Sequence, residues 1–417
     1  MRLTALGTLL LTVALPVHAA ENWPEFLGLL GNNHALTDTA PLRWSETENI
    51  TWRTPIHDRG HSTPVVLGDQ IWLTTAREDG TRSYAVCLDF DSGRVLHERL
   101  VFETPDEDVE EKHALNSFAS PSAVVEPGRV WVHFGEYGTA CLDTTTAETI
   151  WKRRDLRCSH FRGPGSSPIL FEDMLILTYD GIDVQYLVAL DKRTGRTVWR
   201  TDRTTDFDGI DPDFRKAYST PTVITVDGQK QLVSTGAEAT IAYDPHTGRE
   251  LWKVRHPGFS NTPRPLWFDG LVYLNSGFGR TSVLAVRPGA TGDVTDSHVA
   301  WTYSRGVPKK PTPIIVDGLL YMASDDGVIT CLDAATGERV WHDRLPGKYS
   351  ATPLYADGRI YFANHEGLTT VIAPGRELKI LAENRLPTGC MASPIALRDA
   401  ILLRTALAVY KIEQPKD

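Results

Sequence analysis

The sequence offers little support for chemistry that depends on cysteine. It contains five cysteines, an odd number, and no two of them are adjacent. Three occupy the same place before a Leu-Asp pair, in VCLD, ACLD and TCLD, so we interpret them as small core residues. The other two, Cys158 and Cys390, lie in connecting segments. We therefore predict no structural disulfide.

An excess of basic residues is also absent. Lys and Arg number 43 against 53 Asp and Glu, which gives a formal net charge of -10 at pH 7. This balance argues against a nucleic-acid-binding protein that neutralises phosphates over a broad surface. No glycine-rich phosphate loop stands between a strand and a helix, because GFGR at 277–280 connects two expected strands.

Beyond the N-terminus, no apolar run approaches the length of a membrane span. The first residues, MRLTALGTLLLTVALPVHAA, combine Arg2, an apolar run and a small-residue exit, which predicts a signal peptide over 1–19. A buried N-terminal strand is the alternative. No cysteine follows the cleavage point directly, so we expect an exported protein, periplasmic or extracellular, without a lipid anchor.

A Ser-Pro or Thr-Pro pair recurs along the chain at intervals of 40 to 57 residues. Each pair opens an alternating apolar run, followed by a turn such as VDG or ADG and further short strands. Four short strands per unit at this period predict the blades of a β-propeller. The eight pairs are Thr63-Pro64, Ser120-Pro121, Ser167-Pro168, Thr220-Pro221, Thr262-Pro263, Thr312-Pro313, Thr352-Pro353 and Ser393-Pro394.

A second motif, LDAATGERVW at 332–341, has related copies in other units. Its Asp and Thr side chains satisfy turn amides and its Gly adopts positive φ, which predicts a turn between two strands. The Trp that follows is expected to pack against the neighbouring blade. Because the motif is repeated, we interpret it as architecture. The tryptophans at this place are Trp52, Trp151, Trp199, Trp252, Trp301 and Trp341.

The last unit supplies only three strands before the chain ends. The segment NITWRTPI at 49–56 places Trp52 at the right distance to provide the missing outer strand. We therefore predict an all-β, eight-bladed β-propeller of four-stranded antiparallel blades, closed by this N-terminal strand. It would form a single domain over 20–417, with 20–56 as leader and closing strand, and we expect a monomer. Seven blades, with one unit misread, is the alternative.

The repeat A/C-x-D-x-x-T-G-x-x-x-W after a Ser/Thr-Pro strand resembles the PQQ-like β-propeller repeat family. That family includes quinoprotein alcohol dehydrogenases and the BamB outer-membrane assembly lipoproteins. The resemblance covers essentially all of the mature chain, and WPEFLG at 23–28 resembles the leader of exported bacterial members. It implies either a dehydrogenase with PQQ and Ca²⁺ or a non-catalytic protein that binds a partner. The dehydrogenases hold the quinone between a Trp and a disulfide of adjacent cysteines, which this sequence lacks.

Ligands of propellers usually bind at the mouth of the central channel, where the segments ahead of the inner strands converge. Ahead of blades two, three and four these segments span 24, 17 and 22 residues, against 11 to 13 elsewhere. Their basic and hydrogen-bonding groups predict a funnel that attracts an anionic ligand, although rim loops are also polar simply because they face water. The candidates are Arg59, His61, Asn116, His160, Arg162, Lys216, Tyr218, Asn261, Arg264, Lys309, Lys310, Lys348 and Tyr349.

Metal sites have weaker support. The loop DFDGIDPD places Asp206, Asp208, Asp211 and Asp213 at alternating positions, which suits Ca²⁺, but it lacks a closing Glu and also reads as a solvated acidic loop. The acidic run at 103–113 has the same alternative reading. His57 and His61, with His160 from a nearby blade, form another weak candidate.

We therefore predict a non-catalytic exported binding or scaffold protein without a cofactor. Its channel rim would bind a protein partner, an extracellular anionic polymer or a small anionic molecule. A PQQ-dependent dehydrogenase that uses Ca²⁺ is the alternative.

Overall fold

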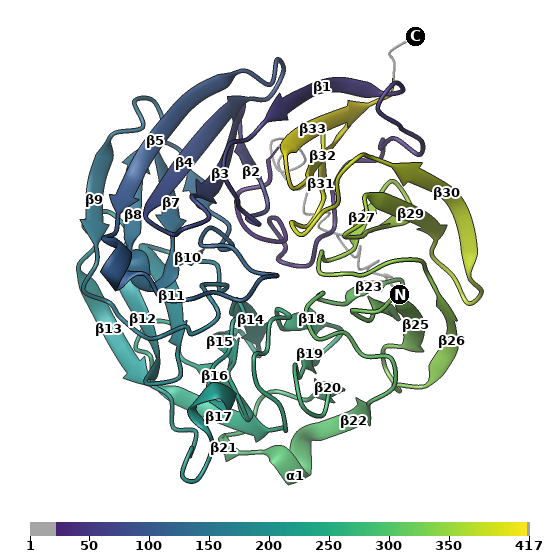
Figure 1. Cartoon of the computed structure of the whole chain (residues 1–417). Helices are drawn as coiled ribbons and strands as arrows, with labels where there is room; N and C mark the ends of the chain where they lie inside the picture. The colour runs from purple at the N-terminus through teal and green to yellow at the C-terminus, as the bar shows by residue number, and fades with distance from the viewer. Residues whose placement is uncertain (1–21, 415–417) are drawn as a thin grey trace, which may run out of the picture.

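A computed structural model describes residues 22–414, and these form eight β-sheets arranged as blades around a central channel (Figure 1). The eight-bladed propeller predicted from the repeats is confirmed. The signal peptide predicted at 1–19 lies outside the described residues. In that described part no helix is long and apolar enough to cross a membrane.

The first four blades follow one another along the chain, each with its inner strand first. Their strands are β2 (Val65–Leu67), β3 (Gln70–Ala76), β4 (Arg82–Asp89) and β5 (Val95–Glu103); β6 (Val124–Glu126), β7 (Arg129–His133), β8 (Thr139–Asp143) and β9 (Thr149–Arg153); β10 (Ile169–Phe171), β11 (Met174–Asp180), β12 (Gln185–Asp191) and β13 (Thr197–Asp202); and β14 (Thr222–Val226), β15 (Gln229–Thr235), β16 (Ala239–Tyr243) and β17 (Glu250–Arg255).

The remaining blades complete the ring, and the last one takes its outer strand from the N-terminal part of the chain. Their strands are β18 (Leu266–Phe268), β19 (Leu271–Asn275), β20 (Val283–Val286) and β22 (Val299–Tyr303); β23 (Ile314–Val316), β24 (Leu319–Ala323), β25 (Val328–Asp333) and β26 (Arg339–Arg344); β27 (Leu354–Ala356), β28 (Arg359–Ala363), β29 (Leu368–Ala373) and β30 (Lys379–Arg385); and β31 (Ile395–Leu397), β32 (Ala400–Arg404), β33 (Ala408–Glu413) and β1 (Ile50–Pro55).

Strand β1 pairs antiparallel with β33, so the predicted closure of blade eight is confirmed. Blade four departs from four antiparallel strands, because a fifth strand, β21 (Gly292–Asp293), pairs parallel with β17. This strand comes from the connection between β20 and β22, where blade five has a longer segment in place of the usual turn. The same connection carries the only α-helix among residues 22–414, α1 (Thr295–His298).

Short 3-10 helices interrupt three of the connections. They are η2 (Asp106–Asp108), η3 (Gly135–Tyr137) and η4 (Pro212–Phe214). Two of them, η2 and η4, lie in the long rim segments ahead of blades two and four. The extra rim material is therefore on one side of the ring, as the segment lengths predicted.

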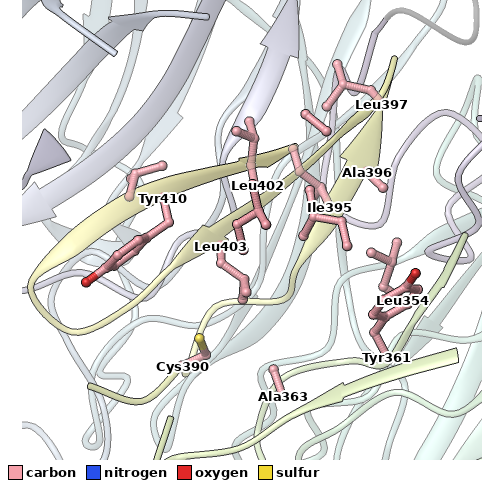
Figure 2. Packing of buried hydrophobic residues seen from close by; sticks show 14 of the residues in the cluster. Leu354, Tyr361, Ala363, Cys390, Ile395, Ala396, Leu397, Leu402, Leu403 and Tyr410 are labelled. Atoms are coloured by element: carbon pink, nitrogen blue, oxygen red, sulfur yellow. The ribbon is translucent and has the colours of Figure 1, made fainter. Parts of the chain in front are cut away.

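The hydrophobic core lies between neighbouring blades rather than inside a single layer. Six clusters each join two successive blades, while the seventh joins blades seven, eight and one with the leader. Figure 2 shows part of that seventh cluster, with Leu402, Leu403 and Tyr410 on the strands of blade eight, and with Leu354 and Tyr361 of blade seven to one side of that sheet. All five cysteines are free and buried in this interior.

The repeated turn and tryptophan join several blades to the next one along the ring. The indole of Trp301 donates to the carbonyl of Ala334 in the following blade at 3.0 Å. Gly337 in that turn has φ +74°, and a Cβ there would lie 2.5 Å from the Trp301 ring. Glycine is therefore required for both backbone and space. The same indole-to-carbonyl bond is made by Trp52, Trp151, Trp199 and Trp341.

Trp252 is the exception among these tryptophans. Its indole donates to Gln231 of its own blade at 2.8 Å. Its backbone pairs with Gly292 of β21, so the added strand takes the place of the missing turn in blade five.

Candidate functional site

A ring of hydroxyl groups surrounds the central channel just before the inner strands. Each hydroxyl oxygen accepts a hydrogen bond from a backbone N–H of the preceding blade, at 2.9 to 3.4 Å. The bond from the N–H of Ser393 to Thr63 joins blade eight to blade one. We call this set the hydroxyl ring: Thr63, Ser122, Ser167, Thr220, Thr312, Thr352 and Ser393.

Arg264 occupies the eighth position of the ring, in blade five. It lies two residues before its inner strand starts, as Thr63 does in blade one. The ring position of blade two is likewise Ser122. The Ser/Thr-Pro pairs at 120–121 and 262–263 therefore lie about two residues ahead of the true repeat position. In these two segments the Ser/Thr-Pro pair directly precedes the ring residue. In the other blades the pair begins with the ring residue, as in Thr63-Pro64.

The leader, residues 22–44, crosses the end of the channel opposite the rim. Trp23 forms an antiparallel bridge with Val66 in blade one. Farther along, the N–H of Ala35 donates to the carbonyl of Tyr355 in blade seven at 2.8 Å. The Nδ2 of Asn33 donates to the carbonyl of Pro353 at 3.0 Å. These contacts are made to the inner strands of blades one and seven and to the residue just before the latter, so the leader spans the ring and covers the channel there.

Arg264 holds this leader in place. Its Nη1 donates to the carbonyl of Phe26 at 2.5 Å, and its Nη2 lies 3.0 Å from Oε1 of Glu25. Its Nε donates to Oγ1 of Thr222 at 3.0 Å. Burial raises the pKa of Glu25, while the Arg264 charge lowers it. The one ring position without a hydroxyl is therefore used to bind the leader.

A cavity of about 490 Å³ occupies the channel on the rim side of the leader. Phe26 of the leader lines it, as do six members of the hydroxyl ring, all except Thr220. The remaining lining comes from rim segments, which the longer connections ahead of blades two to four extend. The cavity is thus a channel with a floor at one end and a rim of varied side chains at the other.

Aromatic and cationic side chains alternate along the rim of blades three to six. Arg162 lies over the ring of Phe161 at 4.2 Å, and Nζ of Lys216 lies 5.5 Å from that ring and 5.4 Å from the ring of Phe259. The rings of Phe259 and Phe278 are 6.2 Å apart. We call this row the aromatic–cation arc, and it offers flat apolar surface beside positive charge.

Comparison with known proteins agrees with this architecture. A family model described as outer membrane protein assembly factor BamB matches residues 183–316 and 306–378. The outer membrane protein assembly factor BamB of Yersinia pestis is 21% identical over 169 residues, which span 39% of this chain and 40% of that protein. A quinohemoprotein alcohol dehydrogenase of Comamonas testosteroni is 38% identical over 53 residues, 12% of this chain and 7% of its own length.

The solved structures extend the likeness to nearly the whole ring. A europium-containing methanol dehydrogenase superposes with a TM-score of 0.69 at 11% identity and covers 94% of this chain and 90% of its own. BamB from Moraxella catarrhalis superposes with a TM-score of 0.62 at 14% identity, covering 87% of this chain and 99% of its own. This chain is an eight-bladed β-propeller that is similar in sequence to BamB over part of its length. At such identities, structural likeness establishes the propeller fold and not the activity.

Six of the rim residues predicted from the sequence line the cavity. They are His61, Asn116, Arg162, Lys216, Tyr218 and Lys310. Three aromatic side chains that the sequence reasoning missed, Phe26, Phe259 and Phe278, also line it. The signal available was an aromatic residue inside otherwise polar rim segments, in PGFSN and GFGR.

The other predicted rim residues lie elsewhere. Tyr349 is 1% exposed in the core between blades six and seven. Asn261 is fully buried, where its amide bonds to the carbonyl of Gly236 and the N–H of Gly277. Arg264 turns toward the leader. Arg59, His160, Lys309 and Lys348 are also absent from the lining, although Lys309 lies over the ring of Phe278 at 5.0 Å. Neighbours in a turn point in different directions, and sequence position does not reveal which one faces the channel.

Most cations at the rim are paired with acids. Asp213 binds Nζ of Lys216 and lies 3.7 Å from Nη2 of Arg162. Nζ of Lys310 lies 3.1 Å from Asp325. Desolvation lowers the pKa of Lys216, which Asp213 opposes. Burial, followed by the nearby charges of Arg59 and Arg404, lowers the pKa of His61 to about 3, so its imidazole is neutral at pH 7.

The acidic candidates do not converge on a metal site in the part of the chain that the structure describes. Asp206 and Asp211 each accept from a backbone N–H two residues on, at 2.9 Å. Asp213 is engaged by Lys216 and Arg162. No group of three His, Cys, Asp or Glu side chains within residues 22–414 has the arrangement to hold a metal ion. His57 pairs instead with Asp58 and Glu98.

These residues do not fit PQQ with Ca²⁺. Asp213 is the only acid among the described residues that line the cavity, and its charge is already matched by two cations. The other described polar groups of the wall are hydroxyl, amide, imidazole and cationic, and no second carboxylate joins Asp213 there to hold Ca²⁺, which is usually bound by several carboxylate and carbonyl oxygens. We derive no step through that cofactor.

His160 belongs to a buried polar cluster behind the rim. Its ring nitrogens lie 3.6 and 3.7 Å from Sγ of Cys158, and burial lowers its pKa to about 4. Glu136 lies beside it, and burial together with the charge of Glu110 raises the pKa of that carboxyl to about 8. The cluster supports the long rim segment before blade three and does not line the cavity.

Proposed function

We propose that this propeller is a non-catalytic, exported binding protein that holds an anionic ligand with a flat apolar part in its channel cavity. The observation that carries the proposal is the cavity itself. It has a floor provided by the leader, aromatic walls at the rim and cationic side chains beside them. Concave sites of this size with a few placed polar groups are the usual form of small-molecule sites. The N-terminal sequence and the likeness to BamB support export.

The polar groups of the cavity favour binding over catalysis. A general acid or base acts best when its pKa lies near the working pH, and the pKa of His61, at about 3, lies far below it. The carboxylate of Asp213 is held by Lys216 and Arg162. These groups orient a ligand and balance its charge without an evident proton-transfer role.

The probe for this proposal is 8-anilinonaphthalene-1-sulfonate, an aromatic sulfonate whose fluorescence rises in apolar sites. We expect saturable binding at one site per chain. The double variant Arg162→Gln with Lys310→Gln removes two cavity cations and weakens binding about 10-fold, or ~1.4 kcal/mol. The control Lys379→Gln with Arg385→Gln removes the same charge from β30, where both residues are exposed, and keeps the wild-type affinity. Equal losses in both double variants would contradict the proposal.

A protein partner on the same face is the second candidate, because Phe161, Phe214 and Leu115 leave exposed apolar surface at the rim. Phe161 and Phe214 do not line the cavity. Changing both to Ser should therefore abolish a protein interaction on this face while leaving sulfonate binding within about 2-fold. Loss of sulfonate binding in this variant would show that the rim and the cavity are not separable.

A PQQ-dependent dehydrogenase is the alternative function, because solved dehydrogenases share the propeller fold as BamB does. Calorimetry with PQQ and Ca²⁺, followed by an assay with alcohols and an artificial electron acceptor, tests it directly. Stoichiometric binding with turnover would overturn the non-catalytic proposal. Without binding, the alternative fails.

A further inference from the structure

The hydroxyl ring presents hydrogen-bond donors to the cavity that the protein itself does not use. Each ring oxygen accepts from a backbone N–H, yet none of these hydroxyls donates to any of the residues at 22–414. A Ser or Thr hydroxyl has a single proton to donate. Six of the seven groups line the cavity and are 1 to 4% exposed. The deep part of the cavity is therefore rich in buried O–H donors without acceptors.

A second observation points to negative charge on the same side of the ring. Arg404, at the end of β32 in blade eight, is 3% exposed. Its Nη1 donates to the carbonyl and the hydroxyl of Ser62, at 3.0 and 2.5 Å. No carboxylate in the described part of the chain lies within 4.0 Å of its nitrogens. By contrast, buried Arg203 and Arg264 have Asp180 and Glu25 as partners.

The position of Arg404 links it to the cavity. Ser62 lies between His61 and Thr63, and both of these residues line the cavity. The Arg404 charge also contributes to the lowered pKa of His61. The guanidinium therefore lies directly behind the cavity wall formed by blades eight and one. An unpaired charge in such a place is stabilised when an anion approaches.

We propose that the deep wall of the cavity at blades eight and one is an oxyanion subsite, which binds a carboxylate, sulfate or phosphate group of the ligand. This inference rests on the proposed function, and it sets the ligand's orientation. The rim cations are largely matched by Asp213 and Asp325, whereas Arg404 is not. The anionic group therefore lies deep, beside Thr63, and the flat apolar part lies outward against Phe259 and Phe278. Oxygen groups that only accept hydrogen bonds use the free ring protons fully.

A matched pair of ring variants tests the subsite. Thr63 and Thr220 both precede a proline, both accept a backbone N–H and are 1% and 2% exposed, but only Thr63 lines the cavity. Thermal unfolding of the full chain would be followed with sulfate, phosphate or acetate at constant ionic strength. We expect Thr63→Val and Thr220→Val to lower the apo Tm by similar amounts. Only Thr63→Val should weaken the anion response. The anion concentration at the midpoint of the Tm increase should rise about 10-fold.

Arg404→Met supplies the second measurement. Because it removes a buried charge that no carboxylate of the described residues balances, the apo Tm should rise or stay unchanged, and the anion response should be lost. The anion with the lowest midpoint identifies which group the subsite takes. No shift in Tm with any of the three anions, or equal responses of Thr63→Val and Thr220→Val, would overturn the inference.

These results separate the subsite from the proposed function. If 8-anilinonaphthalene-1-sulfonate binds at the rim but the three anions leave Tm unchanged, the binding function stands and the subsite is wrong. If the anions raise Tm and the aromatic sulfonate does not bind, the subsite stands and the aromatic part of the proposed ligand is wrong.

Discussion

Nη2 of Arg264 lies 3.0 Å from Oε1 of Glu25, and this ion pair joins the ring of inner strands to the leader that closes the channel. The guanidinium is 4% exposed and the carboxylate 18%. The other seven blades carry a hydroxyl where blade five carries this arginine. Arg264, the one residue that departs from the repeat at this position, is therefore the residue that binds the leader to the ring.

Removing one partner of this pair should be costly. Glu25→Ala leaves the buried Arg264 charge without its carboxylate, and we expect the free energy of unfolding to fall by about 3 kcal/mol in urea titrations. The double variant Glu25→Gln with Arg264→Thr removes both charges and restores the hydroxyl found in other blades. It should recover most of the loss. A double variant as unstable as Glu25→Ala would show that the ion pair is not the cause.

The floor should matter for ligand binding as well as for stability. Phe26 lines the cavity, whereas Leu30 in the same leader is 54% exposed. Phe26→Ala should weaken binding of 8-anilinonaphthalene-1-sulfonate about 10-fold, because it removes apolar contact area. Leu30→Ala should leave the affinity within about 2-fold. Similar affinities for both variants would place the probe elsewhere.

The glycine of the repeated turn should be more sensitive than other glycines with the same backbone. Gly337 and Gly318 both have φ +74°, but a Cβ at Gly318 meets nothing within 4 Å. Gly318→Ala should cost about 1 kcal/mol from the backbone alone. Gly337→Ala also drives a methyl into Trp301, and we expect about 3 kcal/mol in total. Equal losses in urea titrations would mean that the tryptophan moves aside freely.

Glu136 should make stability fall as pH rises. Its pKa in the folded chain, about 8, lies above the ordinary value of 4.5, chiefly because of burial and then because of Glu110. The folded state therefore holds a proton that the unfolded state releases above about pH 4.5. The contribution of this proton to the free energy of unfolding is fully present below that pH. It is lost between about pH 5 and 8, at up to ~1.4 kcal/mol per pH unit.

The variant Glu136→Gln isolates this effect. It should match the wild type near pH 4.5 and exceed its free energy of unfolding by about 4 kcal/mol at pH 8, measured by urea titration in a buffer series. Parallel pH profiles for the two proteins would show that Glu136 is charged in the folded chain.

Much of the fold was predictable because it follows from repetition. Asp333, Thr336 and Gly337 belong to a repeated turn whose chemistry is local, and Trp341 follows at a set distance, so spacing alone was enough to count the blades. The repeat position was predicted two residues too early at Ser120 and Thr262, because a Ser/Thr-Pro pair can precede the inner strand at more than one distance. Only the hydrogen bonds between blades identify Ser122 and Arg264 as the equivalent residues.

The candidate site was predictable to the level of segments and not of side chains. Residues ahead of the inner strands do reach the channel, which is why His61, Arg162 and Lys216 line the cavity. Adjacent residues in the same segments turn away, as Tyr349 and Asn261 do, because turn geometry sets their direction. The contribution of Phe26 arises from a leader more than 200 residues from the blade-five arginine that holds it.

By itself, the sequence determined the number of blades, the closing strand and the segments that reach the channel, since periodic patterning and local turn chemistry need no long-range information. Charge balance required the tertiary structure. A count of basic residues at the rim predicts a positive funnel, yet Lys216, Arg162 and Lys310 have acids beside them, while Arg404 from a distant strand does not. Electrostatic energy depends on distance and burial, so only the folded structure shows which charges have an opposite charge nearby and which do not.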